Sequence, residues 1–240
     1  MIFDDIVITG SRAMAHSYAK INLTLDVLSK RPDGYHNVEM IMQTVSLYDL
    51  ILIDKTEKNI SISTNLKYLP VNEKNIAYKA ALEFFKYTCI KGGCKIMIHK
   101  NIPVAAGLAG GSGNAAAVLC SLDKLYNTNL PLDELMNIAS KLGADVPYCI
   151  MGGTALATGI GEILTPLPSI PKCNILMVKP PISVSTAAIY EAIDTADIDK
   201  RPNTNAMIDA LAQKDLFSVA QNLSNVMGNV TETIHPIVKG

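Results

Sequence analysis

The sequence predicts an α+β protein, and three observations support this fold class. Strand-like and helix-like segments alternate along the chain, without internal repeats or low-complexity tracts. The 240 residues are enough for one large domain or two small ones, and folding buries roughly 70–75% of the extended surface of such a chain. Three prolines within residues 166–171 are typical of a linker, so we expect domains at residues 1–164 and 165–240.

The first expected domain begins with strands and continues with helices. Residues 18–28 alternate polar and apolar side chains, which is the period of a half-buried strand. The helix expected at residues 132–143 opens after Pro131 and ends at Gly143, the positions that proline and glycine favour at helix ends. In order, we expect strands at 18–28, 41–55 and 61–65, a helix at 76–87, a strand at 95–106, helices at 115–126 and 132–143, and a hairpin at 151–162.

The second expected domain has too few strands for a sheet of its own. Its predicted elements are a strand at 174–180 and helices around 185–194, 204–213 and 215–224. Because a single strand cannot form a sheet, we expect this domain to be incomplete or to borrow strands. At the other end of the chain, MAHSYAKINL would be a natural beginning at Met14. Residues 1–13 are therefore either an added leader or an extra strand.

Composition excludes several classes of function. The formal net charge of −1, with scattered lysines, gives no general attraction to nucleic acid or to an anionic membrane. No apolar run reaches the ~18 residues that a membrane span requires, and the acidic start MIFDD is not a signal peptide, so we expect a cytoplasmic protein. The five cysteines are odd in number and lack CxxC spacing, which favours reduced core thiols over disulfides or a metal site. They are Cys89, Cys94, Cys120, Cys149 and Cys173.

Residues 103–116, PVAAGLAGGSGNAA, form a glycine-rich run that leads into an alanine-rich helix. Glycines permit a backbone that curls around a ligand with its N–H groups inward, and a helix N-terminus also attracts negative charge. Ser112 or Asn114 can cap the first turn of the helix. The run matches neither the P-loop, which needs a lysine, nor the dinucleotide motif. It therefore predicts either a phosphate site whose cation comes from elsewhere in the chain, or a flexible turn.

Three separated stretches resemble the motifs of the GHMP small-molecule kinases. They are Ala19-Lys20-Ile21-Asn22-Leu23, the run 103–116, and Leu142-Gly143-Ala144-Asp145-Val146-Pro147. Two further blocks, at residues 31–49 and 152–162, are most similar to the branch of this family that acts on a cytidylated substrate. The five blocks occur in the family's order and the resemblance extends over most of the chain.

The resemblance implies a fold and a reaction. The implied fold has an N-terminal βα domain with a left-handed βαβ-type ATP loop and a ferredoxin-like C-terminal domain. That second domain is expected to be truncated, because the chain stops at HPIVKG without the family's third glycine-rich segment, of the form GSGPTVF. The implied reaction transfers the γ-phosphoryl group of ATP, with Mg²⁺, to the 2-hydroxyl of a cytidylated methylerythritol in non-mevalonate isoprenoid biosynthesis. We expect no nucleic-acid or membrane partner, and a monomer or a weak homodimer.

The resemblance also assigns catalytic and ATP-binding residues. Asp145 matches the family's catalytic acid, which orients the acceptor hydroxyl and takes its proton. Lys20 is placed beside it, where its charge can hold Asp145 ionised and offset the charge of the transition state. The residues that match the ATP loop are Pro103, Val104, Ala105, Ala106, Gly107, Leu108, Ala109, Gly110, Gly111, Ser112 and Gly113.

Five more residues are expected to bind the cytidylated substrate. Asn22 lies two residues after Lys20 in the same predicted strand, so it shares the face of Lys20 and can donate a hydrogen bond. Tyr35 and His36 resemble the element that recognises cytidine, for which an aromatic face and hydrogen bonds are needed. Tyr190 matches an aromatic residue that closes the other side of the base, and Thr186 lies one helical turn earlier.

Two alternatives stay open on the sequence. Another GHMP enzyme, such as a homoserine kinase or a mevalonate-type kinase, would share the glycine-rich loop, although the GYH and LGADVP segments argue against it. A truncated or degenerate paralogue could bind nucleotide without catalysis. The missing third motif favours this second alternative, whereas the presence of both Lys20 and Asp145 opposes it.

Overall fold

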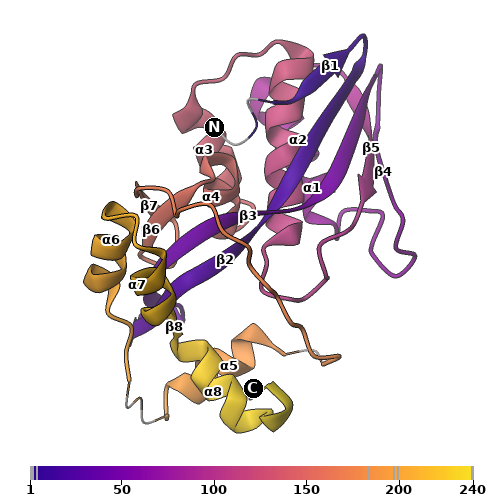
Figure 1. Ribbon diagram of the computed structural model, residues 1–240. Helices are drawn as coiled ribbons and strands as arrows, with labels where there is room; N and C mark the ends of the chain where they lie inside the picture. Colours follow the sequence, from indigo (N-terminus) through magenta and orange to yellow (C-terminus); the bar gives the residue numbers. More distant parts are fainter. Residues whose placement is uncertain (1–2, 4, 183, 197, 199, 239–240) are drawn as a thin grey trace. The chain divides into compact units, whose positions relative to one another are not determined.

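The computed structural model describes residues 3, 5–182, 184–196, 198 and 200–238, and it confirms the predicted α+β class. Strands and helices alternate along the chain (Figure 1). The strands are β1 (Val7–Thr9), β2 (Arg12–Lys30), β3 (His36–Thr56), β4 (Ile60–Thr64), β5 (Gly93–His99), β6 (Thr154–Thr158), β7 (Ile163–Pro166) and β8 (Ser224–Asn225). The helices are α1 (Ile76–Thr88), α2 (Gly110–Tyr126), α3 (Leu132–Ser140), α4 (Asp145–Met151), α5 (Thr186–Ile193), α6 (Thr204–Ala212), α7 (Leu216–Gln221), α8 (Val226–Ile234) and the 3-10 turn η1 (Pro236–Val238).

The chain divides into two compact units that interleave along the sequence. The first unit comprises residues 1–20 and 44–152, and the second comprises residues 21–43 and 153–240. The long strands β2 and β3 contribute residues to both units. The domain boundary expected between residues 164 and 165 stays a prediction. The two compact units are instead divided after residues 20, 43 and 152, and residues 21–43 belong to the same unit as residues 153–240.

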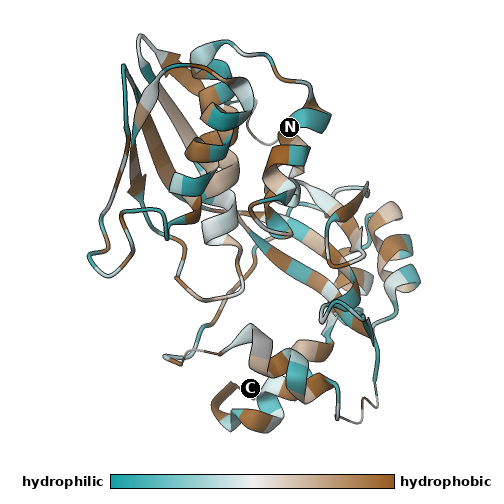
Figure 2. Cartoon of the chain, turned by 180° about the vertical axis from the view of Figure 1, so that it is seen from behind, coloured by the Kyte–Doolittle hydropathy of each residue, from teal (hydrophilic) through white to brown (hydrophobic). Residues whose placement is uncertain are grey.

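The first unit is a sheet with helices on one face. Its strands follow the order β1-β2-β3-β5-β4, and α1 and α2 lie side by side against it (Figure 1). The first part of β2 explains this one-sided packing, because Ala13, Ala15, Ser17 and Ala19 are buried while the residues that alternate with them are partly exposed. Figure 2 shows long hydrophobic stretches, coloured brown, along these strands. The sheet therefore presents one apolar face to the helices.

The helix ends follow local sequence signals in part. The Asn75 side chain caps α1 by accepting a hydrogen bond from the amide of Ala77 at 3.0 Å. Helix α3 begins where proline predicted it, but it ends at Ser140, before Gly143. Helix α2 begins earlier than predicted, at Gly110 instead of residue 115. Among the described residues, no helix has both the length and the apolar character that crossing a bilayer requires.

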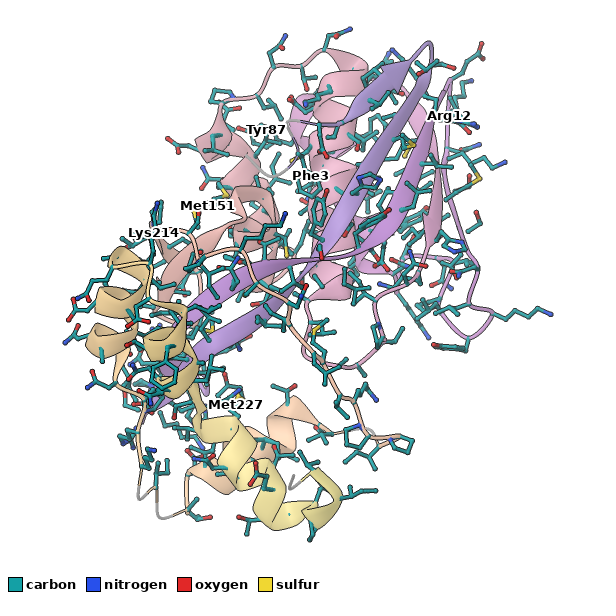
Figure 3. All side chains as sticks on the ribbon, viewed as in Figure 1. Phe3, Arg12, Tyr87, Met151, Lys214 and Met227 are labelled. Atoms are coloured by element: carbon teal, nitrogen blue, oxygen red, sulfur yellow. The ribbon has the colours of Figure 1, made fainter. Side chains whose placement is uncertain are left out.

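The N-terminal segment is an extra strand in the first unit. Strand β1 pairs antiparallel with the start of β2, so this alternative is confirmed for residues 7–9. Phe3 is 1% exposed, and its carbonyl accepts a hydrogen bond from Lys124 Nζ at 2.8 Å (Figure 3). Arg12, also labelled in Figure 3, donates to both carboxylate oxygens of Asp54 at 2.6 and 2.8 Å. This hydrogen-bonded pair lowers the pKa of the Asp54 carboxyl group.

The second unit has its own core and shares the long strands β2 and β3 with the first unit. Strands β8, β2, β3, β6 and β7 are neighbours in that order, and β6 and β7 form the predicted hairpin with Thr158 opposite Ile163. Helices α6 and α7 pack against each other, as do α5 and α8. The side chains buried in the core of this unit are Leu23, Ile41, Met207, Ala210, Leu211 and Val219.

The strand predicted at residues 174–180 is wrong, because this fully described segment forms neither helix nor strand. Its apolar side chains are largely exposed, with Leu176 at 89% and Val178 at 81%. A β-branched and apolar run has strand propensity, but a strand forms only when a neighbour supplies hydrogen bonds. The local pattern was therefore insufficient without a pairing partner.

Candidate active site

The glycine-rich loop has a conformation suited to an anion. The loop, residues 103–109, lies in the connection from β5 to α2, and Ala105, Gly107 and Ala109 adopt positive φ angles of 53°, 71° and 53°. Such alternation can turn successive N–H groups toward one concave side, as in anion-binding nests. Left-handed alanines each cost of order 1–3 kcal/mol, and strain of this kind clusters at functional sites. Sequence reasoning expected glycines to supply the unusual angles and therefore missed the two alanines.

The first turn of α2 extends this anion-binding surface. The N-cap residue is Ala109, without a side-chain cap, so the predicted capping by Ser112 or Asn114 is wrong. The first helical hydrogen bond runs from Gly113 N to Ala109 O at 2.8 Å, and the amides before it lie at the positive end of the helix. A Cβ atom at Gly113 would lie 2.7 Å from Ser17 Oγ. Glycine at this position therefore allows α2 to approach β2 closely.

Lys20 and Asp145 form an ion pair beside the loop. Lys20 lies on β2, Asp145 is the first residue of α4, and Lys20 Nζ is 3.9 Å from Asp145 Oδ2. The lysine side chain is 7% exposed, whereas that of Asp145 is 33% exposed. The backbone amide of Lys20 donates to Leu108 O at 3.1 Å, which joins the loop to β2. The structure thus brings together the predicted catalytic pair and the predicted ATP loop.

The neighbours of this pair are uncharged. Burial raises the pKa of the Cys149 thiol, and the nearby Asp145 charge raises it further. Burial also raises the pKa of the Tyr148 phenol, whose oxygen lies 3.1 Å from Thr44 Oγ1. Both groups keep their protons at neutral pH.

A buried polar network at the base of the loop was missed by sequence reasoning. Asp49 is 0% exposed, and it pairs with Lys100 Nζ and accepts from Asn114 Nδ2 at 2.8 Å. Lys100 lies three residues before the loop and Asn114 follows it in α2. Their flanking positions were the available signal, but nothing in the sequence linked them to Asp49.

A second cluster, in the second unit, contains two predicted substrate-binding residues. The rings of His36 and Tyr190 stack with centroids 4.8 Å apart and an interplanar angle of 14°. His36 Nε2 lies 2.7 Å from Asp194 Oδ1, and Lys30 Nζ donates to Asp194 Oδ2 at 2.5 Å. The hydrogen bonds from Lys30 and then His36 lower the pKa of the Asp194 carboxyl group. Asp194 therefore stays ionised and orients the imidazole ring.

The other predicted substrate-binding residues lie around this cluster or on the strand that leads to it. Thr186 is the first residue of α5, one turn before Tyr190. Tyr35 is adjacent to His36 in sequence and is 61% exposed. Asn22 lies on β2 within the second unit and is half-buried.

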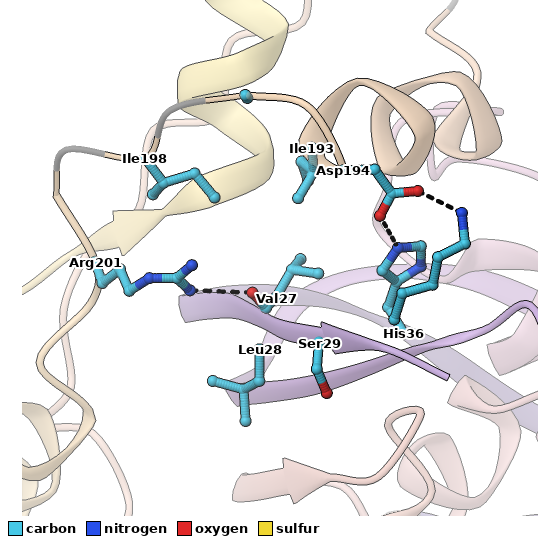
Figure 4. A pocket seen from close by; sticks show the side chains of 10 residues that line it. Val27, Leu28, Ser29, His36, Ile193, Asp194, Ile198 and Arg201 are labelled. Carbon is cyan, nitrogen blue, oxygen red and sulfur yellow. Dashed lines mark hydrogen bonds and ion pairs between the residues drawn. The ribbon is translucent and has the colours of Figure 1, made fainter. Parts of the chain in front are cut away.

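A polar pocket borders the cluster of His36 and Asp194. Its volume is about 360 Å³, and its lining includes Lys30 and Arg201 (Figure 4). Arg201 Nη1 donates to Asp26 Oδ1 at 2.6 Å and to the carbonyl of Val27 at 3.0 Å. Two cationic side chains thus line a hollow next to the aromatic pair.

Comparison with known proteins identifies similar kinases. A profile of the family described as GHMP kinases N terminal domain matches residues 75–153, which include the loop and Asp145. A 4-diphosphocytidyl-2-C-methyl-D-erythritol kinase of Caldicellulosiruptor saccharolyticus is 52% identical over 92% of this chain and 77% of its own length. The enzyme of the same name from Clostridium perfringens is 52% identical, over 93% of this chain and 78% of its own length.

Solved structures agree in fold. A crystal structure of 4-(cytidine 5'-diphospho)-2C-methyl-D-erythritol kinase matches with a TM-score of 0.76 and 30% identity, covering 93% of this chain and 79% of the other. A homoserine kinase from Cytophaga hutchinsonii matches with a TM-score of 0.70 at 15% identity, covering 97% and 78% of the two chains. The second likeness shows the fold alone.

Proposed function

We propose a reaction for this chain from one premise: the chain belongs to the 4-diphosphocytidyl-2-C-methyl-D-erythritol kinase family, among the GHMP kinases. GHMP kinases use ATP as their co-substrate. The proposed reaction transfers the γ-phosphoryl group of ATP to the 2-hydroxyl of 4-diphosphocytidyl-2-C-methyl-D-erythritol, a step of isoprenoid biosynthesis. The observation that carries the proposal is the ion pair of Lys20 and Asp145, whose Nζ and Oδ2 atoms are 3.9 Å apart. The amide of Lys20 also donates a hydrogen bond to Leu108 of the loop.

The proposed mechanism uses the two charged groups differently. Asp145 accepts a hydrogen bond from the acceptor hydroxyl, orients it and takes its proton as the oxygen attacks the γ-phosphorus. The bond from that phosphorus to the bridging oxygen breaks, and ADP leaves. Lys20 offsets the negative charge that builds up during transfer, and burial strengthens this effect because the surroundings exclude water. Amides of the loop and of the first turn of α2 hold the phosphates.

Mg²⁺ fits this site as part of the nucleotide complex. Among the described residues, no group of three or more histidine, cysteine, aspartate or glutamate side chains could hold a metal ion. Mg²⁺ in kinases needs less, because one or two protein oxygens and the substrate phosphates complete its shell. The Ser112 hydroxyl, in the first turn of α2, is the protein oxygen donor we propose. When bound, the ion would neutralise phosphate charge.

We assign cytidine recognition to the second unit. Tyr190 and His36 offer a stacked aromatic surface. The hydrogen bond between His36 Nε2 and Asp194 determines whether the other ring nitrogen, Nδ1, donates or accepts a hydrogen bond. Tyr35, Thr186 and Asn22 are proposed as further contacts. None of the five cysteines, all of which the structure describes, forms a disulfide, and this supports action in the cytosol, where thiols stay reduced.

Turnover of Mg²⁺-ATP tests the proposal directly. We expect phosphorylation of 4-diphosphocytidyl-2-C-methyl-D-erythritol and none of homoserine or mevalonate, measured as ADP release with product mass. Phosphorylation of homoserine instead would assign the chain to another GHMP activity. ATP binding by a folded sample without product from any of the three would favour the nucleotide-binding paralogue.

Replacing Tyr35 should affect substrate binding more than ATP use. For Tyr35→Ala we expect the KM for the cytidylated substrate to rise about two- to tenfold, since an aromatic contact is worth ~0.5–1.5 kcal/mol. The side chain is 61% exposed, so the change should leave folding intact. Tyr68→Ala, at a tyrosine 71% exposed in the first unit, is the matched control. Steady-state kinetics with both substrates varied measures the two KM values. An unaltered KM for the cytidylated substrate would show that Tyr35 does not bind it.

A further inference from the structure

Asp49 is a buried charge with a complete set of partners. It lies on β3 and is 0% exposed. Its Oδ1 atom accepts hydrogen bonds from the amides of Asn101 and Ile102, each at 2.8 Å. Its Oδ2 atom accepts from Asn114 Nδ2 at 2.8 Å and pairs with Lys100 Nζ. An unpaired carboxylate at this depth would be strongly destabilising, so the partners make its burial tolerable.

These partners bracket the glycine-rich loop. The amides of Asn101 and Ile102 immediately precede Pro103, and Asn114 lies in the second turn of α2. Asn114 Nδ2 also donates to Ser17 Oγ at 3.1 Å, and Ser17 lies on β2 three residues before Lys20. One carboxylate therefore ties the entry of the loop to its exit.

The loop needs such anchors because its conformation is unfavourable by itself. Ala105 and Ala109 both have φ of 53°, a region that alanine rarely adopts. Strained angles persist only where the surroundings determine them, and a preorganised site loses less entropy when its ligand binds. Fixed ends leave fewer ways for the intervening residues to relax.

We propose that Asp49 is a positioning residue that holds the loop, residues 103–109, in its nucleotide-binding shape. It acts through Asn101, Ile102 and Asn114. The inference rests on the proposed function, because it takes this loop to be the ATP site. It predicts that Asp49 governs ATP affinity with little influence on the acceptor substrate.

Exchanging the side chains of Asp49 and Asn114 tests the proposal, because the exchange first removes and then restores matched hydrogen-bond donors and acceptors. In Asp49→Asn, the amide oxygen can still accept from the two backbone amides, but its NH₂ group faces two other donors, Lys100 Nζ and Asn114 Nδ2. Adding Asn114→Asp restores an acceptor opposite that NH₂ group. It also returns a carboxylate to Lys100, whose Nζ lies 3.2 Å from Asn114 Oδ1 in the wild type. The Ser17 hydroxyl can rotate to donate.

We expect Asp49→Asn to raise the KM and the calorimetric Kd for Mg²⁺-ATP about 10- to 100-fold, as for a buried polar group left unpaired. The KM for the acceptor should change less than about threefold. The double variant Asp49→Asn/Asn114→Asp should recover most of the ATP affinity. Asp54→Asn is the matched control on the same strand, and it should leave both KM values unchanged.

Hydrogen exchange separates positioning from general destabilisation. In nucleotide-free Asp49→Asn we expect faster exchange at residues 101–109, with the core of α1 unchanged. If Asp49→Asn does not fold, Asn114→Ala removes the link between Asp49 and Ser17 and should give the same split between the two KM values.

Three results would overturn the inference. The first is an unchanged ATP affinity in Asp49→Asn. The second is a loss of ATP affinity in the double variant that is no smaller than the product of the losses in the two single variants. The third is an equal rise in the KM values for ATP and for the acceptor. If the wild-type protein phosphorylates the cytidylated substrate and the variants give any of these results, only the inference about Asp49 is overturned. If the wild-type protein does not bind ATP, the proposed function and the inference about Asp49 are both overturned.

Discussion

Asp145→Asn should bind Mg²⁺-ATP as the wild type does and turn over ~10²–10⁴-fold more slowly, the usual effect of losing a general base. The amide keeps the size of the carboxylate and can still contact the acceptor hydroxyl, but it cannot take its proton. Asp145 is 33% exposed and its proposed contact is with the acceptor, so nucleotide affinity should be spared. Single-turnover kinetics and calorimetric titration with ATP measure the two quantities separately.

The control for this substitution is another aspartate in the first turn of a helix. Asp133 lies in the first turn of α3 and is exposed, so Asp133→Asn removes a similar charge from a helix N-terminus without touching the Lys20 pair. It should retain wild-type turnover. A loss of ATP affinity in Asp145→Asn as large as its loss of rate would place Asp145 at the nucleotide and not at the acceptor.

Lys20→Met should lower kcat by about 10²–10³-fold, the range seen when one preorganised group that stabilises the transition state is removed. Methionine matches the length of the lysine stem, so the site, where the side chain is 7% exposed, stays filled. The KM for ATP should change far less than kcat, because the missing charge acts most strongly as transfer proceeds. Lys86→Met, at a lysine side chain that is 75% exposed, serves as the control.

The double variant Lys20→Met/Asp145→Asn tests whether the two residues act as a unit. We expect its rate to be close to that of the slower single variant, since residues that support one chemical step are strongly non-additive. Independent losses that multiply would show that Lys20 does not act through Asp145 or on the same step.

Much of the candidate site was predictable because its residues lie in short, contiguous motifs. The strand carrying Lys20, the glycine-rich loop and the segment containing Asp145 were each visible as local patterns, and the structure brings them together. Local chemistry also predicted the hairpin at β6 and β7 and the helix at α1. The order of these motifs pointed to the family, and the similar kinases confirmed it.

Other features depend on partners far away in the sequence. Residues 174–180 have the composition of a strand but no ladder, because strand formation needs a neighbour that composition does not supply. The close approach of α2 to Ser17 of β2 depends on the glycine at position 113, because a Cβ atom there would lie 2.7 Å from Ser17 Oγ.

The sequence by itself determined the family, and it predicted the pair of Lys20 and Asp145 and the loop as candidate site residues, because the identity and spacing of neighbouring residues carry that information. The tertiary structure alone decided the interleaving of the two units, the stacking of His36 on Tyr190 and the burial of Asp49 against Asn114. Strand register and helix packing determine which residues become neighbours, although these residues are separated by tens or hundreds of positions in the sequence. A local sequence pattern does not give the spatial distance between such residues.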